Sequence, residues 1–326
     1  TNSSKPLPLK PTTKHGALKL KKRNIFRALA AGVCAGALFF GCKSPAVETI
    51  AVDPLALIDR DAALYLYIPV QSHLPLVTAA LSQITGMAEK DAEKLASRTE
   101  TIYLAEESTR SRNVFQLAAK GSFPQTFAKL ALTQNNGWLP ATADGLSVPY
   151  AYYKNTQSQL QVALPSAANA LVSYGVEPQL ALYDAEVTAS AQNLAAGTPV
   201  AAIPAGFDKA AYEFLTTGNP DDIRFYERKA DSFLQNILDI NLKLPLKSVC
   251  GVLDDEKSAT TYHAKLILEV NEANATPAKM KALVAGIKLA LFGVPAKVTQ
   301  TGASHITIVD LSLSKETLIK LIAQVH

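Results

Sequence analysis

The chain has 326 residues, of which 18% are charged and 48% apolar, a composition that excludes an intrinsically disordered protein. Its three cysteines are too few for a small scaffold held together by disulfides. Residues 1–42 carry eight basic and no acidic side chains, which leaves 24 basic and 28 acidic side chains for residues 43–326. Because the body is net acidic and has no basic stripe, we expect no nucleic-acid partner.

The N-terminal segment has the layout of a secretory signal peptide. A basic stretch ending at Arg27 is followed by thirteen uncharged residues, 28–40, and then by Gly41-Cys42. The apolar part is shorter than the roughly 20 residues that span a membrane. We therefore predict a signal peptide at 1–41. No methionine precedes Met87, and a translation start at Leu18 or Leu20 would shorten this leader to an ordinary length.

The residues around the predicted cleavage site, Leu38-Phe39-Phe40-Gly41-Cys42, resemble a bacterial lipobox, in which the cysteine is acylated and becomes the mature N-terminus. Phe39 and Phe40 are bulkier than usual lipobox residues, a departure typical of spirochaetes. The leader is similar to those of treponemal outer-membrane lipoproteins, some of which have α/β bodies with amphipathic helices that contact the bilayer. The resemblance implies a lipid anchor. Lys43 and Ser44 lack the aspartate that commonly retains bacterial lipoproteins at the inner membrane, which favours the outer membrane. A plain signal peptide with a chance cysteine, or an N-terminal anchor helix, is the alternative.

Acylation of Cys42 is the first testable expectation, with residues 42–54 as the lipidated cysteine and its tether. Each acyl chain contributes about 0.8 kcal/mol per buried CH₂, so several chains hold a protein firmly on a membrane. Palmitate labelling in cells should disappear in Cys42→Ser, and labelling that persists in this variant would contradict the assignment.

Residues 55–184 are expected to form a first α+β unit. An apolar run at 62–68 predicts a strand covered on both faces. The elements that follow are helices at 75–84 and 87–97, strands at 101–106 and 114–120, a helix that begins with a capping box at Ser122 and Gln125, strands at 150–153 and 160–164, and a helix from Ser166 to Gly175.

Residues 198–326 repeat this order after an alanine-rich linker at 185–197. The pattern predicts a strand at 200–203, helices at 208–215 and 223–240, strands at 249–253 and 262–270, a helix from Thr276-Pro277 to Phe292, strands at 297–301 and 305–313, and a helix at 315–325. The nearly constant offset between matching elements favours a tandem duplication of β-α-α-β-β-α-β-β-α units. The predicted fold is α+β, with a largely antiparallel sheet.

Motifs that carry chemistry are missing from the sequence. There is no zinc-protease, dinucleotide, phosphate-loop or paired-cysteine pattern. Cys250 lies in a predicted buried strand and is expected to behave as a small hydrophobe, and no nucleophile or carboxylate accompanies the histidines. We therefore expect a protein without metal, cofactor or enzymatic activity, although a triad assembled from distant residues stays possible.

The helix at 279–292 is the best candidate for an active surface because it has three lysines and no acidic residue. Apolar side chains recur in it at helical spacing, and a basic, strongly apolar helix suits a membrane interface. The predicted membrane or ligand contacts are Lys279, Met280, Lys281, Leu283, Ile287, Lys288 and Leu291. The alternative is a core helix whose lysines extend to solvent.

These patterns favour a lipid-anchored envelope protein, not an enzyme, that binds membrane lipid or another apolar ligand. The second hypothesis is an anchored adaptor or assembly factor that holds a protein partner. The third is a periplasmic hydrolase with an unrecognised site.

Overall fold

The computed structural model describes residues 52–85, 88–108, 113–126, 129, 132–196, 203–228, 230, 244–255 and 261–324. Several predictions fall outside these ranges: the leader, Cys42, most of the tether, the strand at 200–203 apart from Ile203, and the helical positions 231–240. Most of the helix predicted after Ser122 also falls outside them.

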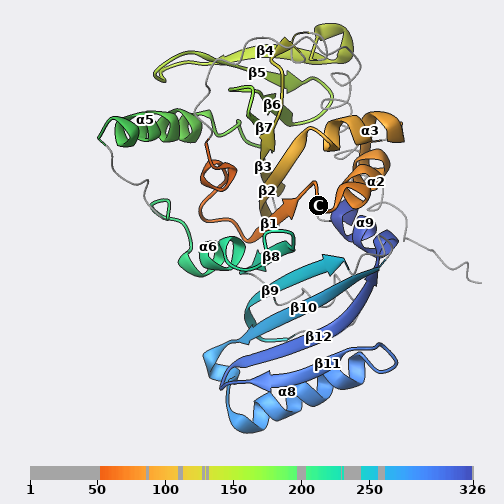
Figure 1. Cartoon of the computed structure of the whole chain (residues 1–326). Coiled ribbons are helices and arrows are strands. Elements are labelled where there is room, and N and C mark those ends of the chain that lie inside the picture. The colour runs from red at the N-terminus through yellow and green to blue at the C-terminus, as the bar shows by residue number, and fades with distance from the viewer. Residues whose placement is uncertain are drawn as a thin grey trace, which may run out of the picture.

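The described strands form one sheet of twelve, in the order β11-β12-β10-β9-β8-β1-β2-β3-β7-β6-β5-β4 (Figure 1). Their bounds are β1 (Leu64–Pro69), β2 (Thr99–Ser108), β3 (Asn113–Gly121), β4 (Trp138–Ala143), β5 (Tyr150–Asn155), β6 (Leu160–Ala163), β7 (Asn169–Tyr174), β8 (Ile223–Glu227), β9 (Leu246–Asp255), β10 (Thr261–Val270), β11 (Lys297–Thr301) and β12 (His305–Ser314). Every neighbouring pair runs antiparallel, which confirms the predicted α+β fold with an antiparallel sheet.

The strands follow the same order on both sides of the central β1–β8 pair. Outward from this pair, β1-β2-β3-β7-β6 on one side corresponds to β8-β9-β10-β12-β11 on the other. The hairpin that matches β11–β12 is therefore β6–β7, and not the hairpin of strands at 150–153 and 160–164 that we predicted. This order is compatible with a tandem duplication, which stays a prediction, as do the unit boundaries at 55–184 and 198–326.

Helices lie on both faces of the sheet (Figure 1). They are η1 (Pro54–Leu57), α2 (Leu74–Thr85), α3 (Glu89–Ala96), η2 (Gln134–Asn136), α5 (Leu180–Ala196), α6 (Lys209–Thr216), η3 (Glu272–Asn274), α8 (Pro277–Ala290) and α9 (Lys315–Gln324). On one face, η1, α5 and α6 pack against aromatic residues of the central strands, such as Tyr65 and Tyr67. On the other face, α2, α8 and α9 enclose the larger core, which contains Ile68 and Ile308.

Two segments predicted as helices are strands. Residues 169–174, predicted as part of a helix, form β7, which is almost wholly buried between β3 and β6. Ser166 Oγ accepts a hydrogen bond (3.0 Å) from the backbone N–H of Asn169, as an N-cap serine does, but a strand and not a helix begins at Asn169. Residues 223–227, predicted as the start of a helix, form β8. A short apolar run has no period that separates a buried strand from a buried helix, and this ambiguity explains both errors.

The predicted linker is helical. Residues 185–196 belong to α5, because alanine is the strongest helix former, and the place of the linker between the two units stays a prediction. The strand β4 was not predicted, and it contains Pro140, a residue that is unfavourable in a central strand. That proline is tolerated because β4 is the last strand of the described sheet.

Two glutamates interrupt an apolar row on the face of the larger core. Glu106 from β2 and Glu227 from β8 are both paired in register with Leu64, and the row continues through Phe115 and Val249. Burial raises the pKa of Glu106 to about 7. Burial and the neighbouring Glu106 carboxyl raise the pKa of Glu227 to about 8. Both carboxyls therefore hold protons at pH values where an exposed glutamate is ionised.

Candidate functional site

The helix α8 begins where the sequence predicts and ends at Ala290, two residues before the predicted end at Phe292. Thr276 is its N-cap residue and Pro277 occupies the first turn, where a missing N–H costs nothing. The helix is followed by Gly293, whose φ of 87° is a conformation that favours glycine. The helix packs against β11, at one end of the sheet (Figure 1).

The inner face of α8 is part of the core, which corrects the predicted surface. Met280, Ile287 and Leu291 are 0%, 1% and 5% exposed, and Leu283 is partly buried against the same cluster. In this fold these four side chains pack with residues of β11 and β12, such as Val298, and so do not face a bilayer. The core-helix alternative is correct for this face.

The outer face of α8 is also apolar, a feature that the sequence analysis missed. Ala282, Ala285, Leu289 and Phe292 are spaced by three, four and three residues, which places them along one side of the helix and the turn that follows it. Leu289 is 76% exposed and Phe292 is 88% exposed, and Val294 beside them is 40% exposed. In the sequence, these residues form a second apolar row, on the side of the helix opposite the buried one.

This end of the sheet is basic although the body as a whole is acidic. Residues 275–309 contain four lysines and no acidic side chain. Lys279 donates hydrogen bonds to the Ala273 carbonyl (3.0 Å) and to Asn274, and Lys297 forms an ion pair with Asp310 (2.8 Å). Within the described part of the chain, the exposed Lys281 and Lys288 have no ion pair. We refer to residues 277–301, which comprise α8, the turn after it and β11, as the basic end.

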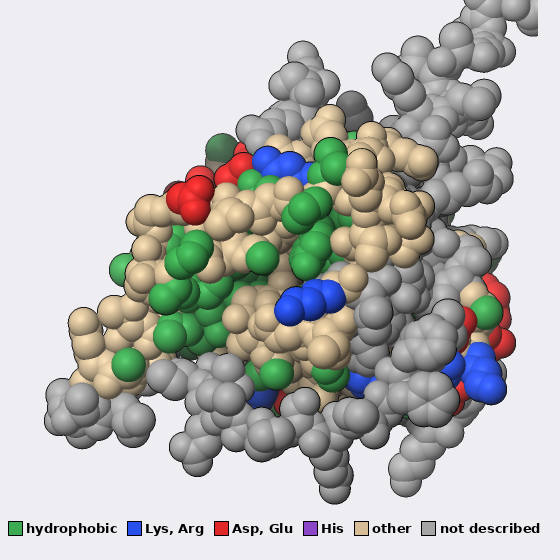
Figure 2. Space-filling view, turned by 90° about the horizontal axis from the view of Figure 1, so that it is seen from above, with side chains coloured by type: hydrophobic (Ala, Val, Ile, Leu, Met, Phe, Trp, Pro, Cys, Tyr) green, Lys and Arg blue, Asp and Glu red, His purple; other side chains and the backbone are tan. Residues whose placement is uncertain are grey.

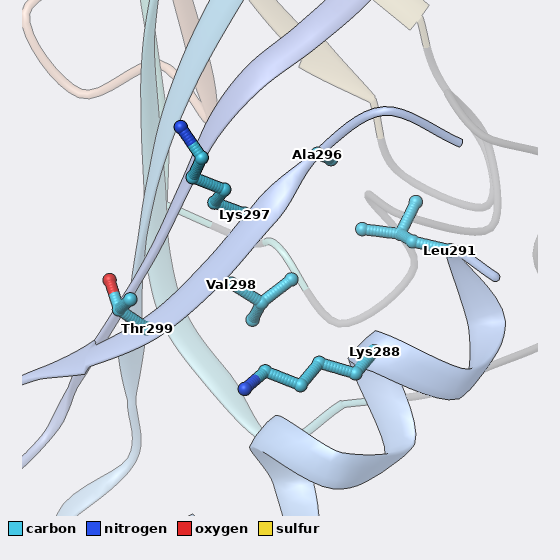
Figure 3. Close-up of a pocket in the computed structure, with 6 residues that line it drawn as sticks. All are labelled: Lys288, Leu291, Ala296, Lys297, Val298 and Thr299. Carbon is cyan, nitrogen blue, oxygen red and sulfur yellow. The ribbon is translucent and has the colours of Figure 1, made fainter. Parts of the chain in front are cut away.

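A groove of about 350 Å³ lies between the last turns of α8 and β11. It is lined by Lys288, Leu291, Ala296, Lys297, Val298 and Thr299. Figure 3 shows that Lys288, Leu291 and Val298 point into the space between helix and strand, whereas Lys297 points away from it. The groove therefore has apolar walls and one inward-pointing cation.

The opposite end of the sheet, at β4, has a different character. Figure 2 shows this end, with apolar side chains gathered across its middle. Its strongly exposed large apolar residues are Leu139 and Val148, at 45% and 51%. Residues 132–153 contain a single charged side chain, that of Asp144. Lys154 of β5 lies opposite Leu139 in the register with β4, and it forms an ion pair with Glu177 (3.3 Å).

His73 and Cys250 lie in surroundings that favour a structural role over a catalytic one. The Nε2 atom of buried His73 lies 2.6 Å from the carbonyl oxygen of Asp221. Burial raises the pKa of the Cys250 thiol to about 12, which keeps it neutral and a poor nucleophile. Within the described ranges, His, Cys, Asp and Glu do not gather in groups of three that would hold a metal ion. None of the helices described here is long and apolar enough to cross a membrane.

Comparison with known proteins relates the chain to a family. The family model described as "Outer membrane-associated lipoprotein TP0453" matches residues 49–319. The outer membrane protein TP0453 of Treponema pallidum (strain Nichols) is 26% identical over 219 residues, which are 67% of this chain and 70% of that protein. Crystal form I of TP0453 covers 85% of this chain and 98% of its own, with a TM-score of 0.59 and 23% identity. For crystal form III these values are 84%, 98%, 0.61 and 21%. The fold is therefore shared.

Proposed function

The chain belongs to the family of the outer membrane-associated lipoprotein TP0453, and from that premise we propose that its basic end docks on membrane lipid. As a member of this family, it is an outer membrane-associated lipoprotein of the cell envelope. The proposed role is that of a lipid-binding protein without catalysis, anchored through acylated Cys42. The body then makes a second contact with the same membrane.

One observation carries this proposal: α8 is apolar on both sides, and only its inner side is covered by the described fold. An apolar face of a helix needs an apolar environment that covers it. Met280 and Ile287 find this environment in the core, while Leu289 and Phe292 are left at the surface. A bilayer would supply it on the outer side.

The lysines of the basic end support lipid over a neutral apolar partner. Each basic residue near an anionic membrane surface contributes on the order of 1 kcal/mol. Burial of a Leu or Phe side chain contributes about 1.5–3 kcal/mol. An apolar, basic contact would add to the binding that the predicted acyl anchor provides.

Flotation with vesicles of phosphatidylcholine and phosphatidylglycerol tests the docking surface. The protein should comprise residues 43–326, which contain every element of the described fold. The double variant Leu289→Ser, Phe292→Ser should bind these vesicles about 100-fold more weakly, because about 3 kcal/mol of apolar burial is lost. Its thermal stability should not change, since both side chains are exposed in the free protein.

The matched control is Leu139→Ser, Val148→Ser, which removes two exposed apolar side chains at the opposite end of the sheet. This variant should float as the parent does. Equal loss in both double variants, or no loss in the first, would contradict docking through the basic end. Binding that fails with every vesicle would instead favour the adaptor hypothesis, in which the same surface holds a protein.

A further inference from the structure

The last strand of the described sheet, β4, has one backbone side without a neighbouring strand. The peptide group that joins Gly137 to Trp138 shows which backbone groups face that side. Its carbonyl accepts a hydrogen bond (2.8 Å) from the N–H of Thr156, which follows β5, and its N–H donates to the Thr133 carbonyl (3.0 Å). Since the C=O and N–H of a planar trans peptide point in opposite directions, the N–H of Trp138 points away from β5.

This direction determines the rest of the outer edge. Successive residues of a strand turn their backbone groups to alternate sides, so the groups of Trp138, Pro140 and Thr142 face outward. The three carbonyls can accept hydrogen bonds from a neighbouring strand. The N–H of Trp138 is already used, and Pro140 has no N–H. Thr142 therefore supplies the remaining donor, and the edge has more acceptors than donors.

Charge does not protect this edge from other strands. All six side chains of β4 are uncharged, and residues 132–153 contain one charged side chain, that of Asp144. Leu139 and Val148 are exposed nearby, and Figure 2 shows apolar side chains gathered at this end of the molecule. An exposed, apolar edge strand is a template for pairing with another chain. Among the features that block such pairing, β4 has a proline in its middle.

The proline has its largest effect on pairing with a second copy of the chain. In a two-fold antiparallel pair centred on residue 140, the prolines of the two copies would lie opposite each other, and Thr142 would lie opposite Trp138. The two Thr142 N–H groups would form two hydrogen bonds with Trp138 carbonyls. The two bonds at the centre would be missing, and the ring carbon that replaces each N–H hydrogen would stand against the opposing carbonyl oxygen.

We propose that Pro140 prevents the chain from pairing edge to edge with a second copy through β4. The inference is independent of lipid docking, because it concerns the opposite end of the sheet. The predicted anchor at Cys42 would make this protection useful, since it would confine many copies to one membrane surface.

Pro140→Val tests the proposal because it restores an outward N–H and removes the ring. The protein of residues 43–326 carrying this change should form dimers in sedimentation equilibrium, whereas the parent stays monomeric at the same concentration. The dissociation constant of the dimer should be about 30-fold lower than that of the parent, the gain expected from two more hydrogen bonds. In hydrogen exchange, the N–H of Thr142 should become protected as the dimer forms. Pro140→Thr should behave alike, because the effect depends on the N–H.

The matched control is Pro149→Val, which removes another exposed proline at the same end of the sheet, outside β4. This variant should sediment as the parent does. The double variant Pro140→Val, Thr142→Pro moves the proline to the next outward position and should return to the monomer. Monomeric Pro140→Val and Pro140→Thr, a dimer that persists in the double variant, or a parent that already dimerises with Thr142 protected would overturn the proposal.

Discussion

The folded chain should become more stable as the pH falls from about 8 toward 4.5, the ordinary pKa of a glutamate carboxyl. The cause is the pair Glu106 and Glu227, which lies in an apolar row on both sides of Leu64. Burial raises both folded-state pKa values, to about 7 and about 8. In this interval the folded state therefore binds more protons than the unfolded state does.

The direction follows from proton linkage. Where the folded state holds more protons, the free energy of unfolding falls as pH rises, by up to about 1.4 kcal/mol per pH unit and per carboxyl. The stabilisation by the two protonated carboxyls is fully present below the unfolded pKa of 4.5. It is lost as pH rises through about 7 for Glu106 and about 8 for Glu227. Most acid-sensitive proteins show the opposite slope, because their carboxylates are paired in the folded state.

Denaturant unfolding across this pH interval is the measurement. The double variant Glu106→Gln, Glu227→Gln should lose most of the slope, because an amide stays neutral at every pH. Glu100→Gln is the matched control, since Glu100 lies on the same strand but is 58% exposed and paired with Lys120. A slope that persists in the double variant would show that other groups cause it.

Truncation of Ile287 should destabilise the fold by about 2–5 kcal/mol, the usual cost of a large-to-small change in a core. Ile287 is 1% exposed and belongs to the larger core, together with residues of β11 and β12. Equilibrium unfolding of Ile287→Ala by denaturant measures this loss. Leu289→Ala, two residues later and 76% exposed, should change the stability by no more than about 0.5 kcal/mol.

These two variants separate the two sides of α8. If Ile287→Ala folded as stably as the parent and instead lost vesicle binding, the inner side of the helix would be the lipid-facing one. The expected pattern is the reverse. Ile287 should govern stability, and Leu289 with Phe292 should govern membrane binding.

Elements with a clear local pattern were predictable from the sequence. The strand β10 alternates buried side chains with half-buried or exposed ones along its whole length, which is the pattern of a strand with one face in the core. The start of α8 is marked by Thr276-Pro277, and α6 follows Asp208, whose carboxylate accepts a hydrogen bond from the N–H of Ala211. Such signals act over a few residues and do not depend on the rest of the fold.

Elements whose identity depends on their neighbours were not predictable. The strands β7 and β8 are short apolar runs, and they are strands because β3, β6, β1 and β9 pair with them. The outward side of α8 was misjudged for a related reason. Both sides of this helix are apolar, so its periodicity does not show which side meets the sheet, and the packing with Val298 decides it.

The depth of residue 292 in a bilayer tests the central claim most directly. The chain has a single tryptophan, Trp138, which is fully buried, so a Phe292→Trp variant places a second, exposed reporter at the basic end. On vesicles that contain phosphatidylglycerol, emission from this reporter should shift to shorter wavelength and be quenched by lipids brominated on their acyl chains. Emission that stays unchanged and unquenched while the protein floats with the vesicles would show that the basic end does not enter the membrane.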